Sequence, residues 1–396
     1  MRSTGSKGES STDSGLTYAL LLGNAPWRQW ALASRLALLT ISMGPLGYVL
    51  AGRAATGSFA AGGLLAGANA FGQGLGAPLQ GRRLDRNETR TSLLWMMTLA
   101  GGVFGLLALA VSLHAPLAVL LGGAFLAGVS VAGVPGGYRA LLPGLVAAKD
   151  VDMALTVDAA LVEVVWITGP PLVSFIVVLS SATVALATMA VLALLAAALS
   201  LPLPRRPPHG VSVHVGGVIT RVALPIYAVA FAMGLAFGGL DFGFAPLAKA
   251  IGAGPAAGGI LISLLAASSG VSALVYATRR PAASTLRRVG FGLMIWAVLM
   301  TPLSLIPSLW IGILLTPLAG LPVSVLNTQV SLLLRVRLPH ERQAEAFSIV
   351  WSSMTIGAGI GSTIGSACIG PLGVRSVFLI IPAMVLVLGA VLAAVS

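Results

Sequence analysis

Four charged side chains stand inside long apolar stretches of the sequence, and their types limit the chemistry that they can perform. They are Arg35, Asp158, Glu163 and Asp241. A carboxylate in nonpolar surroundings can take up and release a proton, hold a cation or neutralise an arginine. If the stretches lie in a lipid bilayer, each charge costs about 2.5 to 3.5 kcal/mol on insertion scales, so each is a candidate functional group.

The three acids differ in their depth within these stretches. Glu163 lies about nine residues into the fifth stretch, roughly 13 Å from its start at the helical rise per residue, and it is the deepest acid. Asp158 stands nearer the start of the same stretch, and Asp241 stands near the outer end of the seventh. Both of these can reach headgroups and water. Depth therefore makes Glu163 the first candidate for a coupling role.

The elements that hold these residues are predicted to be membrane-spanning helices. Of the 396 residues, 57% are hydrophobic and only 9% are charged, and the mean hydropathy is +0.97. The apolar stretches are about 20 residues long, as a helix needs to cross the hydrocarbon layer, and they lack the alternation of a β-barrel strand. We predict twelve spans, at residues 30–50, 59–79, 92–113, 116–137, 154–179, 182–203, 222–244, 256–277, 289–306, 310–334, 347–369 and 377–395.

The placement of positive charge predicts the orientation of these spans. The net charge is +12, from 23 Lys and Arg against 11 Asp and Glu. With the N-terminus in the cytoplasm, all of these cations lie on the cytoplasmic side except Arg53, Lys249 and Arg375. This asymmetry follows the positive-inside rule, so we expect both termini in the cytoplasm and no nucleic-acid partner.

The chain is predicted to divide into two halves. Its longest internal polar segment, PRRPPHGVSVHVGGVIT, begins at Pro204 and is rich in Pro and Gly, as linkers are. We expect a cytoplasmic polar tail at 1–26, a six-helix bundle at 27–203, a cytoplasmic linker at 204–221 and a second six-helix bundle at 222–396. The predicted fold class is therefore an all-α membrane protein with 12 transmembrane helices in two bundles.

A short motif after the second span carries a family resemblance. It runs from Gly81 to Arg90 and contains Asp85 followed by Arg86. Its residue types, spacing and position resemble the signature between the second and third helices of the major facilitator superfamily. The resemblance implies a gating loop. Asp85 would meet the positive N-terminal end of a neighbouring helix, the eleventh, and Arg86 and Arg90 would bind carboxylates or lipid phosphates.

The fifth span carries a second, partial resemblance, to exporters of this superfamily. Gly169 and Pro170 are similar to the Gly-Pro pair in the fifth helix of many such exporters, although Val165, Val173 and Ser174 replace the flanking glycines. A purely mechanical kink is an equal alternative, because proline removes a backbone donor. Ala124 stands where drug/proton antiporters usually carry an intramembrane arginine.

The family's packing also suggests a partner for Arg35. In that fold the first and fifth helices are neighbours, so Arg35 can form a structural ion pair with Glu163 or with Asp158. In the alternative, Glu163 carries a proton during the transport cycle or holds a cationic substrate. The sequence leaves both interpretations open.

Two amides of the tenth span are candidate substrate contacts, because the tenth helix lines the central cavity in this family. They are Asn327 and Gln329. Asn69 and Gln73 of the second span are expected to hold helices together instead. The remaining lining predicted from the family is apolar, which suits an amphipathic solute.

These observations predict a secondary transporter, and not an enzyme, that exports a small amphipathic organic molecule with protons as the coupling ion. The sequence contains no P-loop and no catalytic or zinc motif, and Cys368 is its only cysteine, so we expect no cofactor and no metal site. The alternatives are an uptake symporter or uniporter, and a receptor or scaffold with a transporter fold. We expect a monomer in contact with membrane lipids. The Lys-poor composition suggests a bacterial inner (plasma) membrane.

Overall fold

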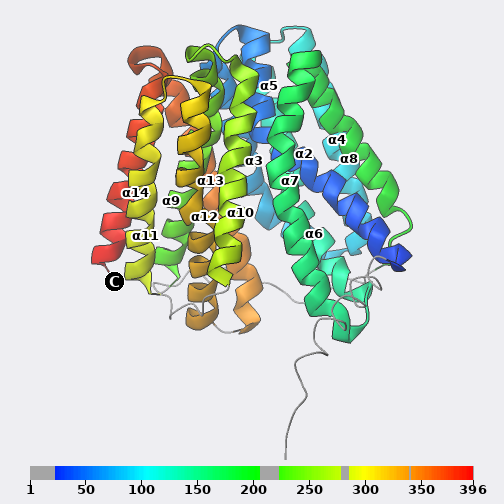
Figure 1. Ribbon diagram of the computed structural model, residues 1–396. Helices are drawn as coiled ribbons and strands as arrows, with labels where there is room; N and C mark the ends of the chain where they lie inside the picture. Colours follow the sequence, from blue (N-terminus) through cyan, green and yellow to red (C-terminus); the bar gives the residue numbers. More distant parts are fainter. Residues whose placement is uncertain (1–22, 206–222, 278–284, 339, 396) are drawn as a thin grey trace, which may run out of the picture.

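The computed structural model describes residues 23–205, 223–277, 285–338 and 340–395, which form helices joined by short turns (Figure 1). Residues 1–22 of the predicted tail and 206–221 of the predicted linker lie outside the described residues. The first described helix starts at Ala25, with Asn24 as its N-cap: the Asn24 side chain accepts a hydrogen bond from the Trp27 amide at 3.2 Å.

The helices fall into two consecutive groups along the chain. The first group contains α2 (Ala25–Thr56), α3 (Phe59–Arg86), α4 (Thr89–Ser112), α5 (Leu117–Val131), α6 (Val134–Leu141), α7 (Val151–Leu179) and α8 (Ala182–Ser200). The second contains α9 (Leu224–Ala250), α10 (Gly258–Ala277), α11 (Leu286–Met300), α12 (Leu309–Arg337), α13 (His340–Leu372) and α14 (Val377–Ala394). Helices α5 and α6 together form one interrupted span.

Eleven helical segments of the described chain are long and apolar enough to cross a membrane. They correspond to eleven of the twelve predicted spans, so the prediction of a multi-pass membrane protein is confirmed. The remaining predicted span corresponds to α3, which has 28 residues and is about 42 Å long. Glycines, Asn69, Gln73 and a charged last turn lower its hydropathy, and it packs between other helices, chiefly α5 and α13.

Several helices extend beyond the predicted spans. Helix α3 continues to Arg86, where the sequence predicted an end at residue 79, and α9 continues to Ala250, where it predicted an end at residue 244. Hydropathy marks the part of a helix that sits in hydrocarbon, whereas backbone hydrogen bonding continues into the polar layer. As a result, Asp241 lies nine residues before the end of α9 and not near its outer end.

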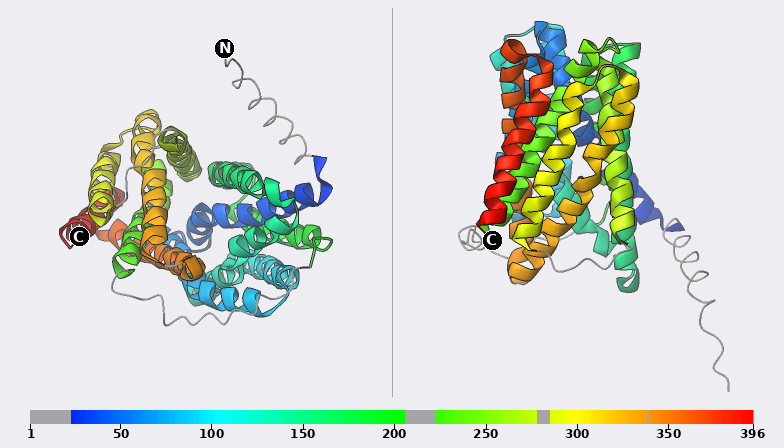
Figure 2. Two further views of the ribbon diagram at one scale, coloured as in Figure 1. Left: turned by 90° about the horizontal axis from the view of Figure 1, so that it is seen from below. Right: turned by 60° about the vertical axis from the view of Figure 1, so that its left-hand side comes forward.

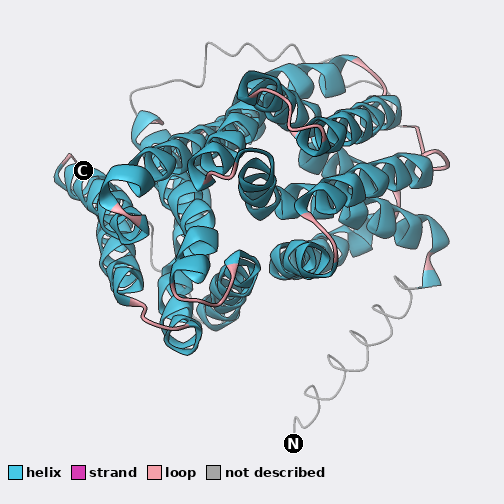
Figure 3. Cartoon of the chain, turned by 90° about the horizontal axis from the view of Figure 1, so that it is seen from above, coloured by secondary structure: helices cyan, strands magenta, loops and turns pink. Residues whose placement is uncertain are grey.

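Each group of helices packs mainly on itself. In the first group, α2 contacts α3, α7 and α8, and in the second, α9 contacts α13 and α14. Contacts between the groups are concentrated in two helix pairs, α3 with α13 and α7 with α10, and a smaller contact joins α2 to α9. Seen along the helices, the two groups lie side by side (Figures 2 and 3).

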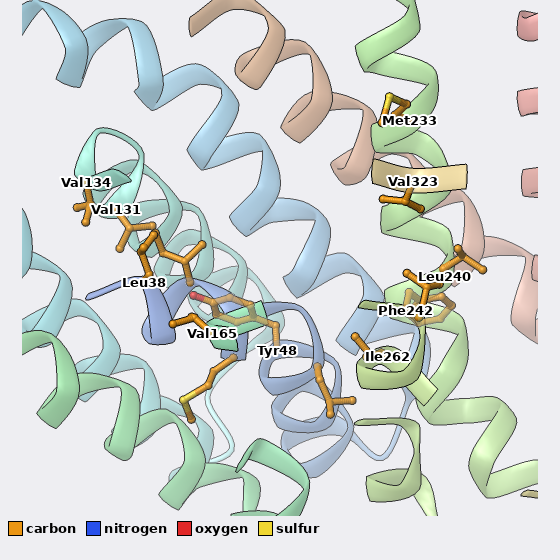
Figure 4. Packing of buried hydrophobic residues seen from close by; sticks show 14 of the residues in the cluster. Leu38, Tyr48, Val131, Val134, Val165, Met233, Leu240, Phe242, Ile262 and Val323 are labelled. Atoms are coloured by element: carbon orange, nitrogen blue, oxygen red, sulfur yellow. The ribbon is translucent and has the colours of Figure 1, made fainter. Parts of the chain in front are cut away.

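Both groups have a buried apolar core. Figure 4 shows Leu38, Tyr48 and Val165 on helices of the first group and Leu240 and Phe242 on a helix of the second. Close backbone packing supplements these cores. Gly357 and Gly361, part of a glycine repeat in α13, lie against the backbone of α9, where a Cβ atom would overlap the carbonyl groups of Phe231 and Leu235.

Candidate functional site

A cavity of about 310 Å³ lies between the two groups of helices. Helices α2, α3 and α7 line it from the first group, and α9, α10, α12 and α13 line it from the second. This volume is at the lower end of the range for pockets that bind small molecules. Because both groups contribute to the wall, any movement of one group against the other changes the cavity.

Two carboxyl groups line this cavity, Glu163 from α7 and Asp241 from α9. Within the described part of the chain, neither forms a hydrogen bond or an ion pair. The Glu163 carboxylate faces α10, since a Cβ atom placed on Gly270 would lie 3.9 Å from its Oε2 atom. The described lining residues include no Lys, Arg or His. The cavity therefore contains two carboxyl groups and no cationic side chain among its described lining residues.

The third acid, Asp158, lies outside the cavity in a buried ion-pair cluster. The Arg35 guanidinium donates to the Asp158 carboxylate, with 2.6 Å between Nη2 and Oδ1, and to the Asp158 backbone carbonyl at 3.1 Å. Arg139 of α6 approaches the other carboxylate oxygen at 3.6 Å. Asp158 is only 4% exposed, so the expectation that it reaches water is wrong. Of the two pairings left open for Arg35, the structure contains the one with Asp158.

The two acids of α7 face different surroundings because of helix geometry. Asp158 and Glu163 are five residues apart, which rotates them by about 140° around the helix axis. Asp158 therefore points toward α2 and α6, whereas Glu163 points into the cavity. The sequence signalled both acids but did not reveal Arg139 as a partner.

The two predicted amides of α12 also lie in different surroundings. Asn327 lines the cavity, and its side chain is exposed there without a hydrogen bond to the described residues. Gln329 is buried between helices and donates a hydrogen bond to the Tyr276 hydroxyl of α10. Of the two predicted substrate contacts, only Asn327 can touch a molecule in the cavity.

Both amides of α3 line the cavity, and Asn69 holds helices together, as the sequence suggested, whereas Gln73 bonds to Asn69 within α3. Asn69 donates hydrogen bonds to the Tyr48 hydroxyl at 2.9 Å and to the Ala124 carbonyl at 3.2 Å, and it accepts one from Gln73 at 2.8 Å. These bonds connect α2, α3 and α5. Ala124 stands where drug/proton antiporters usually carry an arginine, and its backbone carbonyl is one of the acceptors in this network.

Sequence reasoning did not single out the aromatic wall of the cavity. Trp166 of α7, Phe237 of α9 and Trp351 of α13 all line it. Phe237 is held by an edge-to-face contact with Trp296, with 5.3 Å between ring centroids. One signal was present in the spacing: Trp166 follows Glu163 by three residues, and Phe237 precedes Asp241 by four.

The fold and the cavity described above agree with the match of this sequence to a known protein family. The family model of the Major Facilitator Superfamily matches residues 30–334. The chain belongs to the major facilitator superfamily. It is therefore a transporter, with a small-molecule substrate, and not an enzyme.

Solved structures of other facilitators have the same fold. The nucleoside transporter NupG superposes with a TM-score of 0.72 at 14% identity, over 93% of this chain and 98% of that one. A POT family transporter in complex with 5-aminolevulinic acid gives a TM-score of 0.69 at 10% identity, over 92% and 94% of the two chains. None of the curated proteins is significantly similar in sequence.

In this facilitator, the Gly-Pro motif lies at two helix contacts. Gly169 packs against Ser42 of α2 so closely that a Cβ atom would overlap its hydroxyl group. Helix α7 runs without interruption through Pro170 and Pro171. Because Pro171 has no N–H, the Ile167 carbonyl loses its usual donor within the helix. Ser263 of α10 donates to that carbonyl at 2.8 Å.

The predicted gating loop is mostly helical. Gly81, Asp85 and Arg86 belong to the final turns of α3, and Arg90 lies in the first turn of α4. Arg90 donates to the Leu201 carbonyl at the end of α8, at 2.9 Å, and pairs with Glu88 at 3.5 Å. The predicted partner of Asp85 is the start of α13, where the side chains of residues 340–345 lie outside the described part of the structure.

Proposed function

We propose that this facilitator exports a small amphipathic organic molecule by alternating access and takes up protons in exchange. The observation that carries the proposal is the cavity between the two helix groups, which Glu163 lines from one group and Asp241 from the other, with no cationic side chain among the described lining residues. A carboxyl group that has no ion-pair partner can bind and release a proton during each cycle. The Gly-Pro pair at 169–170, similar to that of exporters, supports the outward direction.

The proposed moving parts are two six-helix bundles, 27–203 and 222–396, joined by the linker 204–221. The concentration of inter-group contacts in two helix pairs supports this division. We also place both termini in the cytoplasm, because the cations gather at that end of the spans. The start of α2 and the end of α14 lie toward the same end of the molecule, as an even number of spans requires (Figures 1 and 2).

In this orientation, we assign the closure of the outer end of the cavity to two contacts. Ser174 of α7 donates a hydrogen bond to the Ala256 carbonyl, just before α10. The Lys249 ammonium lies 5.7 Å from the centre of the Phe59 ring, which joins the end of α9 to the start of α3. We assign the gating role at the opposite, cytoplasmic end to Gly81, Asp85, Arg86 and Arg90.

A flux experiment tests the proposal. The purified protein is reconstituted in liposomes that contain a pH-sensitive dye, and three compounds that share a benzyl group are added in turn: benzyltrimethylammonium, benzyl alcohol and phenylmethanesulfonate. We expect at least one of them to move protons in the opposite direction to itself. Glu163→Gln or Asp241→Asn should abolish this exchange.

The matched control is Asp152→Asn, the same acid-to-amide change at an exposed position in the first turn of α7. It should leave the exchange intact. Flux that ignores the pH gradient would contradict proton coupling, proton movement in the same direction as the compound would contradict export by exchange, and the absence of flux for every compound would favour a receptor or scaffold.

A further inference from the structure

Each half of the cavity presents a carboxyl group one helical turn from an aromatic ring. On α7 these are Glu163 and Trp166, at a spacing of three residues, and on α9 they are Asp241 and Phe237, at a spacing of four. Residues at these spacings lie on one face of a helix. Trp351 of α13 adds a third ring. The two halves therefore present the same combination of groups to the space between them.

Among the described residues, no cationic side chain lies over an aromatic ring of the cavity. The structure contains five contacts between a cation and a ring among the described residues, and they involve the rings of Trp30, Phe59, Trp95 and Phe291. None of these rings lines the cavity. The faces of Trp166 and Trp351 are thus available to a positive charge that comes from outside the protein.

We propose that the substrate is an organic cation, whose charged nitrogen lies between Glu163 and Asp241 and whose apolar body packs against Trp166, Phe237 and Trp351. This inference deepens the proposed function and rests on it. The attraction between a cation and a carboxylate grows in nonpolar surroundings, and a ring face adds to it. The same two acids repel an anion.

The geometry favours a weakly hydrated nitrogen, tertiary or quaternary, over a metal ion. No group of three or more His, Cys, Asp and Glu side chains able to hold a metal occurs in the described chain. Glu163 and Asp241 together supply at most four carboxylate oxygens, fewer than the six to eight oxygen ligands that calcium needs. A cavity of about 310 Å³ accommodates one ring system together with its cationic group. Asn327 can orient a polar substituent.

Direct binding tests this assignment. Benzyltrimethylammonium, benzyl alcohol and phenylmethanesulfonate are titrated separately into the full-length protein in detergent, and heat is measured by calorimetry. We expect the cation to bind at least about tenfold more tightly than the alcohol, and the sulfonate not to bind. Glu163→Gln and Asp241→Asn should each weaken binding of the cation about tenfold, and Trp166→Leu about threefold.

Control variants separate charge from folding. Asp152→Asn should bind the cation like the wild type, and every variant should keep the wild-type elution volume and melting temperature. If Asp241→Asn is poorly folded, two other variants test whether charge binds the cation. Asp241→Glu keeps the charge and should keep binding, and Glu163→Gln removes a charge and should weaken it.

Three outcomes would overturn the assignment. They are no binding of the cation by the wild-type protein, equal binding of the alcohol or the sulfonate, and unchanged binding of the cation by both acid variants. These failures are distinct from failure of the proposed function. Coupled flux of the sulfonate would leave the transporter proposal intact and contradict the cation site. Tight binding of the cation without any flux would leave the cation site intact and contradict the transporter proposal.

Discussion

The two halves of this facilitator meet along two helix pairs that are built differently. In the pair of α3 and α13, glycines bring the backbones together over several turns. A Cβ atom on Gly67 would overlap the Thr363 side chain, and one on Gly74 would overlap Ile356. Ser362 of α13 donates to the Gly63 carbonyl of α3 at 2.9 Å. This pair leaves no room for an additional methyl group at these glycines.

The pair of α7 and α10 relies on hydroxyl groups at one end. Ser263 donates to the Ile167 carbonyl at 2.8 Å, and Ser174 donates to the Ala256 carbonyl. Gly259 of α10 also lies close to α7 at this end, where a Cβ atom would overlap the Ser174 hydroxyl group. Further along, a Cβ atom on Gly270 would lie 3.9 Å from the Glu163 carboxylate. Net hydrogen-bond contributions are about 0.5 to 1.5 kcal/mol each, so few interactions need to break for this pair to separate. We therefore expect α3 and α13 to remain in contact while α7 and α10 open and close.

Covalently joining α7 to the start of α10 should have the largest effect. In a Cys368→Ala background, Ser174→Cys and Ala256→Cys are linked with a short bifunctional thiol reagent. If these segments must separate in each cycle, the link abolishes flux, and a reducing agent that cleaves the link restores it. Each single-cysteine variant, treated identically, should keep its flux. Unchanged flux in the linked protein would contradict the proposed movement.

Filling the glycine contact should come next. Gly67→Val adds side-chain atoms where Thr363 already lies, and overpacking of this kind costs about 1 to 3 kcal/mol. We expect a lower melting temperature in detergent and loss of flux. Gly102→Val is the matched control, because a Cβ atom at Gly102, in α4, would meet no atom within 4 Å. Equal melting temperatures for the two variants would argue against a tight α3–α13 contact.

Removing one hydroxyl should have the smallest effect. Ser263→Ala deletes the donor to Ile167 and weakens the α7–α10 contact by about 1 kcal/mol without adding volume. We expect a nearly unchanged melting temperature but greater access of thiol reagents to a cysteine at position 174. Ser112→Ala, which removes an exposed hydroxyl at the end of α4, is the control. Reduced access would contradict the assigned role of the hydroxyl.

Much of the fold was predictable, because a membrane imposes a simple length and composition on each helix. The helix ends were not predictable, because hydropathy does not detect the helical turns that continue beyond the hydrocarbon layer. The consequence was largest for Asp241, which looked peripheral in the sequence and lies in the cavity wall. Glu163 was identifiable as a carboxyl group deep in an apolar stretch.

The partners of these residues were beyond the sequence. Whether Arg35 meets Asp158 or Glu163 depends on the rotation of α7 about its axis, and rotation is fixed only by packing. Trp166 and Trp351 look like any other aromatic residues in apolar stretches, and spacing from an acid was a signal for Trp166 alone. The exporter-like Gly-Pro pair and Pro171 after it were visible, but not the serine of α10 that donates to the carbonyl group freed by Pro171.

The buried pair of Arg35 and Asp158 has a consequence for the synthesis of the protein. The two residues are separated by 123 positions, so Arg35 enters the membrane before its counter-charge has been translated. At usual elongation rates the interval is roughly 6 to 25 s. During this time α2 carries an uncompensated charge, which favours retention beside the insertion machinery until α7 arrives. Biogenesis of the first half should therefore be a concerted event and not a helix-by-helix release into lipid.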